Sequence, residues 1–163
     1  MAEPSADDLL GHVSGHYIAA TQDLKKAQFS RSDHDGLIKK GAKPMKLPGP
    51  DHPITITPNP KRVRVSVGGV VVADTTRALT LKEASYPAVQ YVPRTDANMA
   101  LLDRTERVTH CPYKGDANYF SIRADGAMLE NSIWTYEKPY PAMAEIAGHL
   151  AFYPDKVKVE EVG

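Results

Sequence analysis

Residues 109–119 read Thr109-His110-Cys111-Pro112-Tyr113-Lys114-Gly115-Asp116-Ala117-Asn118-Tyr119. Proline and glycine interrupt regular structure at the centre of this stretch, so residues 112–115 are predicted to form a turn. The flanking residues, about 107–110 and 118–123, are predicted as strands. Adjacent strand residues point to opposite faces, so His110 is badly placed to activate Cys111.

Alternation of apolar and polar residues predicts further strands on both sides of this stretch. Residues 62–67 alternate, and Gly68-Gly69 suits the tight turn of a hairpin with residues 70–73. Other strands are expected at 78–81, 89–92 and 132–136, with edge strands near 54–57 and 157–159. A short helical turn capped by Thr95 or Asp96 and a helix beginning around Pro139 are also expected. The predicted fold class is therefore mostly β or α+β, with antiparallel strands.

The first 47 residues have a different pattern. Leu10, Val13 and Tyr17 recur at helical spacing, which predicts a helix over residues 6–27. Prolines and glycines then punctuate residues 30–60 and indicate a connector. The predicted organisation is an N-terminal helix and connector, residues 1–47, followed by a β domain, residues 48–163. His12 and His16 would share a helical face, where two exposed histidines are favoured over a metal site because no third ligand is evident.

Composition argues against several functional classes. Twenty basic and twenty acidic residues leave no net charge, so the basic footprint of a nucleic-acid-binding domain is absent. One cysteine excludes an internal disulfide and a cysteine-rich zinc site. No apolar run approaches the roughly 18 residues of a membrane-spanning helix. A cytoplasmic location without membrane contact is expected, because the N-terminus also lacks the pattern of a signal peptide.

Aromatic residues and one lysine indicate a small-molecule pocket. Tyrosines and the single tryptophan gather between residues 86 and 140, and such rings suit ligands held by stacking and a few hydrogen bonds. Packing in the core of a small β domain is an equal alternative for these rings. The predicted ligand-binding residues are Tyr91, Arg94, Asp96, Cys111, Tyr113, Lys114, Tyr119 and Trp134. No metal site and no cofactor are predicted, and the catalytic residues are not identified.

Lys114 and Cys111 each have a second interpretation. A lysine beside the strand faces can hold a carboxylate or phosphate, but a surface lysine in a turn is favoured by spacing alone. Cys111 could be a nucleophile if neighbouring cations lowered its pKa. A small, buried and inert cysteine is the favoured interpretation.

Several segments resemble domain-of-unknown-function family 427, over about residues 48–161. The resemblance is carried by residues 48–56, 70–75, 91–96 and 99–102, by Cys111-Pro112-Tyr113-Lys114-Gly115 through Tyr119, by Trp134, Tyr136 and Pro139, and by residues 144–153. It implies a β-tent fold, in which two small antiparallel sheets lean together around an aromatic-lined ligand pocket. Related tents often carry a zinc ion held by two cysteine pairs, which one cysteine cannot reproduce.

Three functions are compatible with these features. The first is a domain that binds a small molecule, such as a nucleotide or another anionic or cyclic-amide compound. The second is an enzyme, in which Lys114 stabilises developing charge and Glu83 or Asp96 acts as base. The resemblance implies a nucleotidyltransferase in this case, and magnesium would be needed only then. The third is an interaction module whose helix 6–27 packs on a partner or forms a homodimer.

Overall fold

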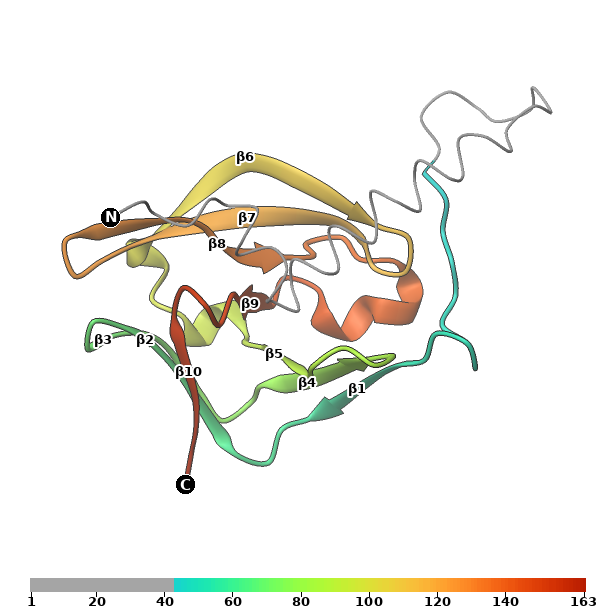
Figure 1. Cartoon of the computed structure of the whole chain (residues 1–163), viewed down its shortest axis with the longest axis horizontal. Helices are drawn as coiled ribbons and strands as arrows, with labels where there is room; N and C mark the ends of the chain where they lie inside the picture. The colour runs from blue at the N-terminus through green and yellow to red at the C-terminus, as the bar shows by residue number, and fades with distance from the viewer. Residues whose placement is uncertain (1–42) are drawn as a thin grey trace.

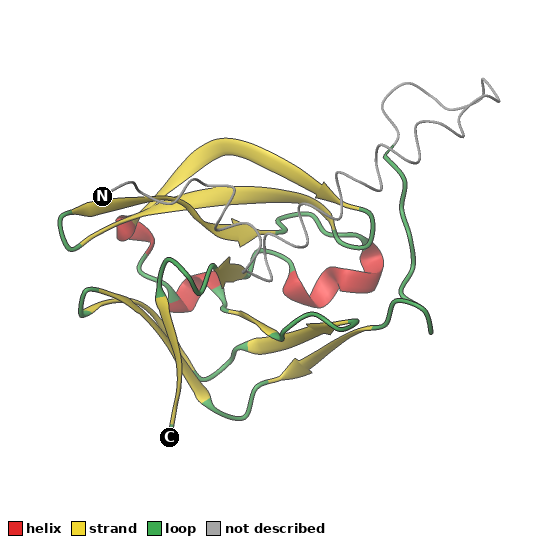
Figure 2. Cartoon of the chain, in the orientation of Figure 1, coloured by secondary structure: helices red, strands yellow, loops and turns green. Residues whose placement is uncertain are grey.

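The computed structural model describes residues 43–163 of the chain. The predicted helix at 6–27, with His12 and His16, lies outside the described residues, as does most of the predicted connector. In the described part, the chain forms ten strands and three short 3₁₀ helices (Figures 1 and 2). The predicted mostly β class is confirmed, whereas the strands form three antiparallel sheets rather than two.

The first two sheets each contain three strands. In one, β1 (Ile54–Pro58), β4 (Leu79–Glu83) and β5 (Val89–Tyr91) are arranged in the order β1-β4-β5. In the other, β2 (Arg62–Val67), β3 (Val70–Thr75) and β10 (Lys158–Val162) are arranged in the order β10-β2-β3. Gly68 and Gly69 have φ angles of 54° and 83° and form the predicted β2–β3 turn. The predicted edge positions of β1 and β10 are also confirmed.

The third sheet has the order β6-β7-β8-β9 and contains the longest strands. Its members are β6 (Leu102–Cys111), β7 (Gly115–Ala124), β8 (Ala127–Thr135) and β9 (Leu150–Phe152). The strand β6 extends well beyond its predicted segment, because residues 103–107 are all polar and show no apolar alternation. The strand β7 begins three residues earlier and ends one residue later than predicted. The chain reverses between β7 and β8 at Asp125 and Gly126, two residue types that are typical of turns.

The helical segments are shorter than expected. The first two are η1 (Arg94–Asp96) and η2 (Met99–Leu101), and neither has a side-chain cap from Thr95 or Asp96. The third, η3 (Pro141–Ile146), begins two residues after Pro139, near which a helix was predicted to start, and winds as a 3₁₀ helix. Six residues give too few hydrogen bonds to make a stable α-helix without tertiary packing.

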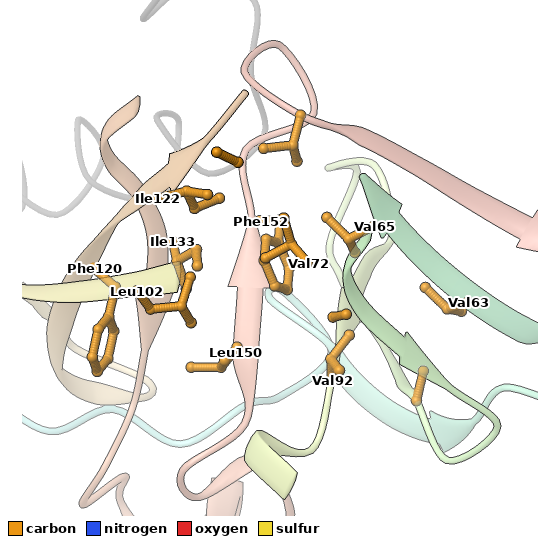
Figure 3. Close-up of a cluster of buried hydrophobic side chains, with 14 residues drawn as sticks. Val63, Val65, Val72, Val92, Leu102, Phe120, Ile122, Ile133, Leu150 and Phe152 are labelled. Atoms are coloured by element: carbon orange, nitrogen blue, oxygen red, sulfur yellow. The ribbon is translucent and has the colours of Figure 1, made fainter. Parts of the chain in front are cut away.

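Two buried clusters fill the interior between the sheets. One contains aliphatic side chains and two phenylalanines from β2, β3 and β6–β9; Figure 3 shows Val65 and Val72 close to Phe152, with Ile122 and Ile133 beyond. The other is rich in tyrosine and lies between β4–β5 and the β7–β8 pair, with η3 beside it. This second cluster contains most of the predicted ligand-binding residues.

Candidate functional site

The turn at residues 112–115 directs Lys114 into the tyrosine-rich cluster. Gly115 has a φ of +106°, a conformation that glycine adopts without strain, and it starts β7 directly after Lys114. The Lys114 carbonyl accepts a hydrogen bond from the Tyr140 amide at 2.9 Å, which joins the turn to the start of η3. Lys114 is therefore completely buried, and the interpretation as a surface lysine is wrong.

Lys114 forms an ion pair with Glu83 inside the cluster. Its Nζ donates to Glu83 Oε2 at 2.5 Å and lies 3.9 Å from Cys111 Sγ. Glu83 is the last residue of β4 and is only 4% exposed. Burying two charges usually costs more than their attraction returns, so such a pair is weak evidence of stability and a reason to look for function.

His52 completes this network at its outer side. Its Nε2 lies 2.8 Å from Glu83 Oε1, and its ring stacks on Tyr113 with centroids 4.1 Å apart and an interplanar angle of 7°. The His52 side chain is 17% exposed, whereas those of Glu83 and Lys114 are 6% and 0% exposed. His52 and Tyr113 therefore separate the buried ion pair from solvent.

Burial and pairing act in opposite directions on these groups. Burial raises the pKa of Glu83, but Lys114 and His52 outweigh this effect and hold the pKa of that carboxyl below its usual 4.5. Burial lowers the pKa of Lys114, yet the acidic groups of Cys111, Glu83 and Tyr91 raise it above its ordinary value. Both groups are charged at neutral pH, so Lys114 is not a free nucleophile.

This shift predicts an acid-sensitive contribution to stability. A carboxyl whose pKa is lower in the folded state stabilises the protein above its unfolded pKa, near 4.5, and loses this effect as the pH falls through the folded pKa. The urea unfolding free energy of wild type should exceed that of Glu83→Gln at pH 7, and the gap should narrow below about pH 4.5. A difference in unfolding free energy that stays constant down to pH 3 would contradict the pairing. Asp74, Asp96 and Asp116 also have lowered pKa values, but they are present in both proteins, so their effect cancels in this comparison.

The aromatic side of the cluster is organised around Trp134. Its indole Nε1 donates to the Tyr91 hydroxyl at 3.1 Å, and its ring lies 4.6 Å from that of Tyr153. The Tyr119 hydroxyl lies 2.9 Å from Thr109 Oγ1. Burial, partly offset by Lys114, raises the pKa of Tyr91 to about 12, so its hydroxyl stays protonated at neutral pH.

Five of the eight predicted residues are members of this one cluster: Tyr91, Cys111, Tyr113, Tyr119 and Trp134. A sixth, the buried Lys114, reaches the cluster through its contact with Cys111. Arg94 and Asp96 belong to η1 and lie outside it. Asp96 accepts hydrogen bonds from Thr75 Oγ1 at 2.6 Å and Arg77 Nη2 at 2.8 Å. Arg94 lies over the Phe120 ring, 5.2 Å from its centroid, and 3.8 Å from Glu137.

The sequence analysis did not place His52, Tyr136 or Tyr153 in the site. His52 comes from the proline-rich segment before β1, where no periodic pattern marks a contact with residue 83 or 113. Tyr136 and Tyr153 follow β8 and β9 and are buried. The position of Tyr136 among the tyrosines of residues 86–140 was an available signal, whereas Tyr153 lies outside that stretch. Among residues 43–163, no group of three histidine, cysteine or acidic side chains is placed to hold a metal ion.

A cavity lies on the other side of Trp134, where strands of all three sheets meet. It has a volume of about 160 Å³. Its lining is mainly apolar: Val63, Val65, Ala88, Val89, Gln90, Val92, Trp134, Phe152, Pro154 and Val159. The side-chain oxygen Oε1 of Gln90 accepts hydrogen bonds from Asn59 Nδ2 at 2.9 Å and from Thr80 Oγ1 at 3.0 Å. Gln90 is the only polar residue of this lining with an amide side chain, and among the described residues no partner is seen for its side-chain nitrogen.

A family model named NTP_transf_9 and described as "Domain of unknown function (DUF427)" matches residues 55–163, more than half of the chain. The match covers every strand of the three sheets except the first residue of β1. No curated protein matches the sequence. No helix within residues 43–163 is long and apolar enough to cross a membrane.

Proposed function

Since the chain belongs to the family described as domain of unknown function 427, we propose that it is a small-molecule-binding domain whose ligand is a neutral, planar carbonyl compound. The observation that carries this proposal is the cavity walled by Trp134. Ring compounds such as cyclic amides and nucleobases have the required chemistry.

The size of the cavity limits the ligand. An apolar cavity of about 150 Å³ admits benzene, so a volume of about 160 Å³ suits a single ring of similar size. The indole of Trp134 offers a flat wall, and Val89 and Phe152 offer apolar contacts. Trp134 Nε1 is already used by Tyr91, so the Gln90 amide is left to donate to a ligand carbonyl.

The apolar lining of the cavity disfavours a negatively charged ligand. A charged group would lose its hydration among valine, proline and aromatic side chains, at a cost of several kcal/mol. Lys114 does not compensate, because Glu83 already neutralises it at 2.5 Å. The proposal therefore keeps the cyclic-amide ligand anticipated from the sequence and places no nucleotide phosphate at Lys114.

The β-tent assignment and a cytoplasmic location are part of the same proposal. In support of the tent, the four-stranded sheet lies across the interior from the two three-stranded sheets (Figure 1). Side chains from β2 and β3 pack against those from β6–β9 in one cluster. A ligand cavity at the meeting point of the sheets is what this architecture implies.

A thermal-shift screen tests the proposal on the full chain. Uracil, hydantoin, succinimide and benzene are the probes, and we expect a carbonyl ring to raise Tm by about 3–5 °C at about ten times its Kd. Benzene should give a smaller shift because it cannot accept from Gln90.

Val159→Phe supplies the discriminating variant, because it fills the cavity from a half-buried position on β10. Val71→Phe is the matched control, since Val71 is 44% exposed on β3 and does not line the cavity. The shift should disappear in Val159→Phe and persist in Val71→Phe. Equal shifts in both variants would place the ligand elsewhere.

An enzyme is a second candidate, favoured by the contact between His52 and Glu83. A carboxylate bonded to one imidazole nitrogen fixes the ring and leaves the other nitrogen available for proton transfer. Nδ1 of His52 has no hydrogen-bond partner among residues 43–163, and its ring is partly exposed. His52 does not line the cavity, so a substrate would have to approach it from solvent. NMR spectra of the ring compounds incubated with the protein would show conversion by wild type and none by His52→Gln. Unchanged ligand with wild type would count against this candidate.

The third function, an interaction module, depends on residues 1–47, which lie mostly outside the described residues. Deletion of this segment tests it through the oligomeric state: a dimer that dissociates on deletion supports it. A chain that is equally monomeric with and without the segment contradicts it.

A further inference from the structure

The outer face of the β6–β7 hairpin has a groove that is separate from the cavity and the tyrosine-rich cluster. His110 pairs directly with Asp116 across the two strands, and Val108 pairs with Asn118. Because strand residues alternate between faces, these side chains lie opposite to Cys111 and Ala117, which face the interior. The groove has a volume of about 480 Å³. The remaining lining residues are Lys43, Arg104, Gly115, Glu137, Lys138 and Tyr140.

At one end of the groove, two basic groups share one carboxylate. Asp116 Oδ1 lies 2.8 Å from both Lys43 Nζ and His110 Nδ1. The side chains of Lys43 and Asp116 are 44% and 48% exposed, so both remain in reach of a solute. The His110 ring meets the edge of Tyr140 at a centroid distance of 6.2 Å, which gives this end an aromatic wall.

The other end repeats this arrangement. Glu137 is paired with Arg104 and, at 3.8 Å, with Arg94. The Asn118 amide, in the orientation that satisfies both of its ends, donates to Glu137 and accepts from Arg104 at 3.2 Å each. The Arg94 Nε is buried and has no hydrogen-bond partner among the described residues. Glu137 therefore has more basic neighbours than it can neutralise.

Lys138 adds a cation between the two ends. It is exposed, and no ion-pair partner is seen for it in residues 43–163. Lys43, Arg104 and Lys138 thus line the groove against two acidic lining residues, Asp116 and Glu137. Arg94 does not line the groove but lies 3.8 Å from Glu137 and adds positive charge beside it. A groove with this excess of positive charge in a chain with no net charge is a local concentration of anion-binding groups.

We propose that this groove is a second binding site, for a small multiply charged anion of the phosphoryl or carboxyl type. Arg104 already donates to Glu137 and Asn118, but its guanidinium has further N–H groups that can donate to oxygens of such an anion, and Lys138 contributes a point charge. Tyr140 and His110 provide the aromatic surface beside it. This site is independent of the ligand proposed for the cavity at Trp134.

Isothermal titration calorimetry on the full chain tests the groove, with pyrophosphate and citrate as separate probes at low ionic strength. At least one probe should bind, and the stronger one identifies the anion type. Arg104→Met and Lys138→Met should each weaken binding about tenfold. Raising the salt concentration to about 0.5 M should weaken the binding of the probe to wild type, since exposed charges are screened.

Arg123→Met is the matched control. Arg123 is 52% exposed and pairs with Asp103, whereas Arg104 is 50% exposed and pairs with Glu137. The control should bind the probe as wild type does. The proposal is overturned if neither probe binds, if Arg104→Met and Lys138→Met bind as tightly as wild type, or if Arg123→Met is equally weakened. Because Lys138 has no ion-pair partner within residues 43–163, weaker binding by Lys138→Met cannot be attributed to the loss of a structural ion pair. Val159→Phe should bind the anion normally, so this test and that of the cavity fail separately.

Discussion

Replacing Lys114 with methionine is expected to lower the free energy of unfolding by about 3–5 kcal/mol. Methionine keeps most of the volume of the side chain but leaves Glu83 buried without its cationic partner. His52 still contacts the other carboxylate oxygen at 2.8 Å, so the loss comes from the oxygen that accepts from Lys114. Urea unfolding followed by circular dichroism at pH 7 measures the change.

The double variant Glu83→Gln/Lys114→Met distinguishes an unpaired charge from a packing defect. Removing both charges should recover roughly half or more of the lost stability, because glutamine leaves no unpaired charge buried at position 83. Lys158→Met is the surface control: Lys158 pairs with Glu160 in the open, and its loss should cost less than about 1 kcal/mol. A single variant as stable as wild type, or a double variant no better than the single, would contradict the assigned role of the pair.

Trp134→Ala should cost about 3–5 kcal/mol, the usual range for removing a buried large aromatic side chain. Trp134 is 3% exposed, packs on Tyr153 and donates to the Tyr91 hydroxyl. Trp134→Phe keeps the apolar contact and removes the donor, so it should cost less than the alanine variant. Circular dichroism is needed for unfolding, since Trp134 is the single tryptophan of the chain.

Met128→Ala is the control on the same strand, because Met128 is 49% exposed near the start of β8. Its effect should lie within about 0.5 kcal/mol of wild type. A loss in Met128→Ala comparable to that in Trp134→Ala would show that truncation anywhere in β8 is damaging. The aromatic centre would then have no special contribution to stability.

Alternation and turn residues predicted much of the fold. Val63, Val65 and the Gly68-Gly69 turn define a hairpin by local pattern alone, and Asp125-Gly126 marks the reversal between β7 and β8. The order of strands within the sheets could not be predicted as well, because it depends on contacts between distant segments of the chain. The β1–β4 pairing and the bridge between Val92 and Leu150 join parts of the chain that no local signal connects.

The candidate site was predicted only in part, because some of its contacts are local in sequence and others join distant segments. Lys114 lies near Tyr113 and Tyr119 because all three belong to one turn and the strand that follows it. Other tyrosines, such as Tyr91 on β5, reach the cluster from distant segments. The partner of Lys114 is 31 positions away, so the sequence could not show that Glu83 neutralises it. Arg94 and Asp96 were included because they are close to Tyr91 in sequence. The turn at η1 instead carries them to Glu137 and to Thr75 with Arg77.

The same arrangement gives the protein an intrinsic reporter. Trp134 lines the proposed cavity on one side and contacts Tyr91, next to the buried ion pair, on the other. A ligand that enters the cavity changes the surroundings of the only tryptophan. Binding can therefore be followed without a label or an assumed reaction.

The most direct test of ligand binding in the cavity is a fluorescence titration of Trp134 with the carbonyl rings, in wild type, Val71→Phe and Val159→Phe. If a carbonyl ring binds in the cavity, we expect a saturable change in the emission of wild type and Val71→Phe, and none in Val159→Phe. Binding in the cavity is contradicted if no carbonyl ring alters the emission of wild type, or if the folded Val159→Phe variant responds with the same Kd.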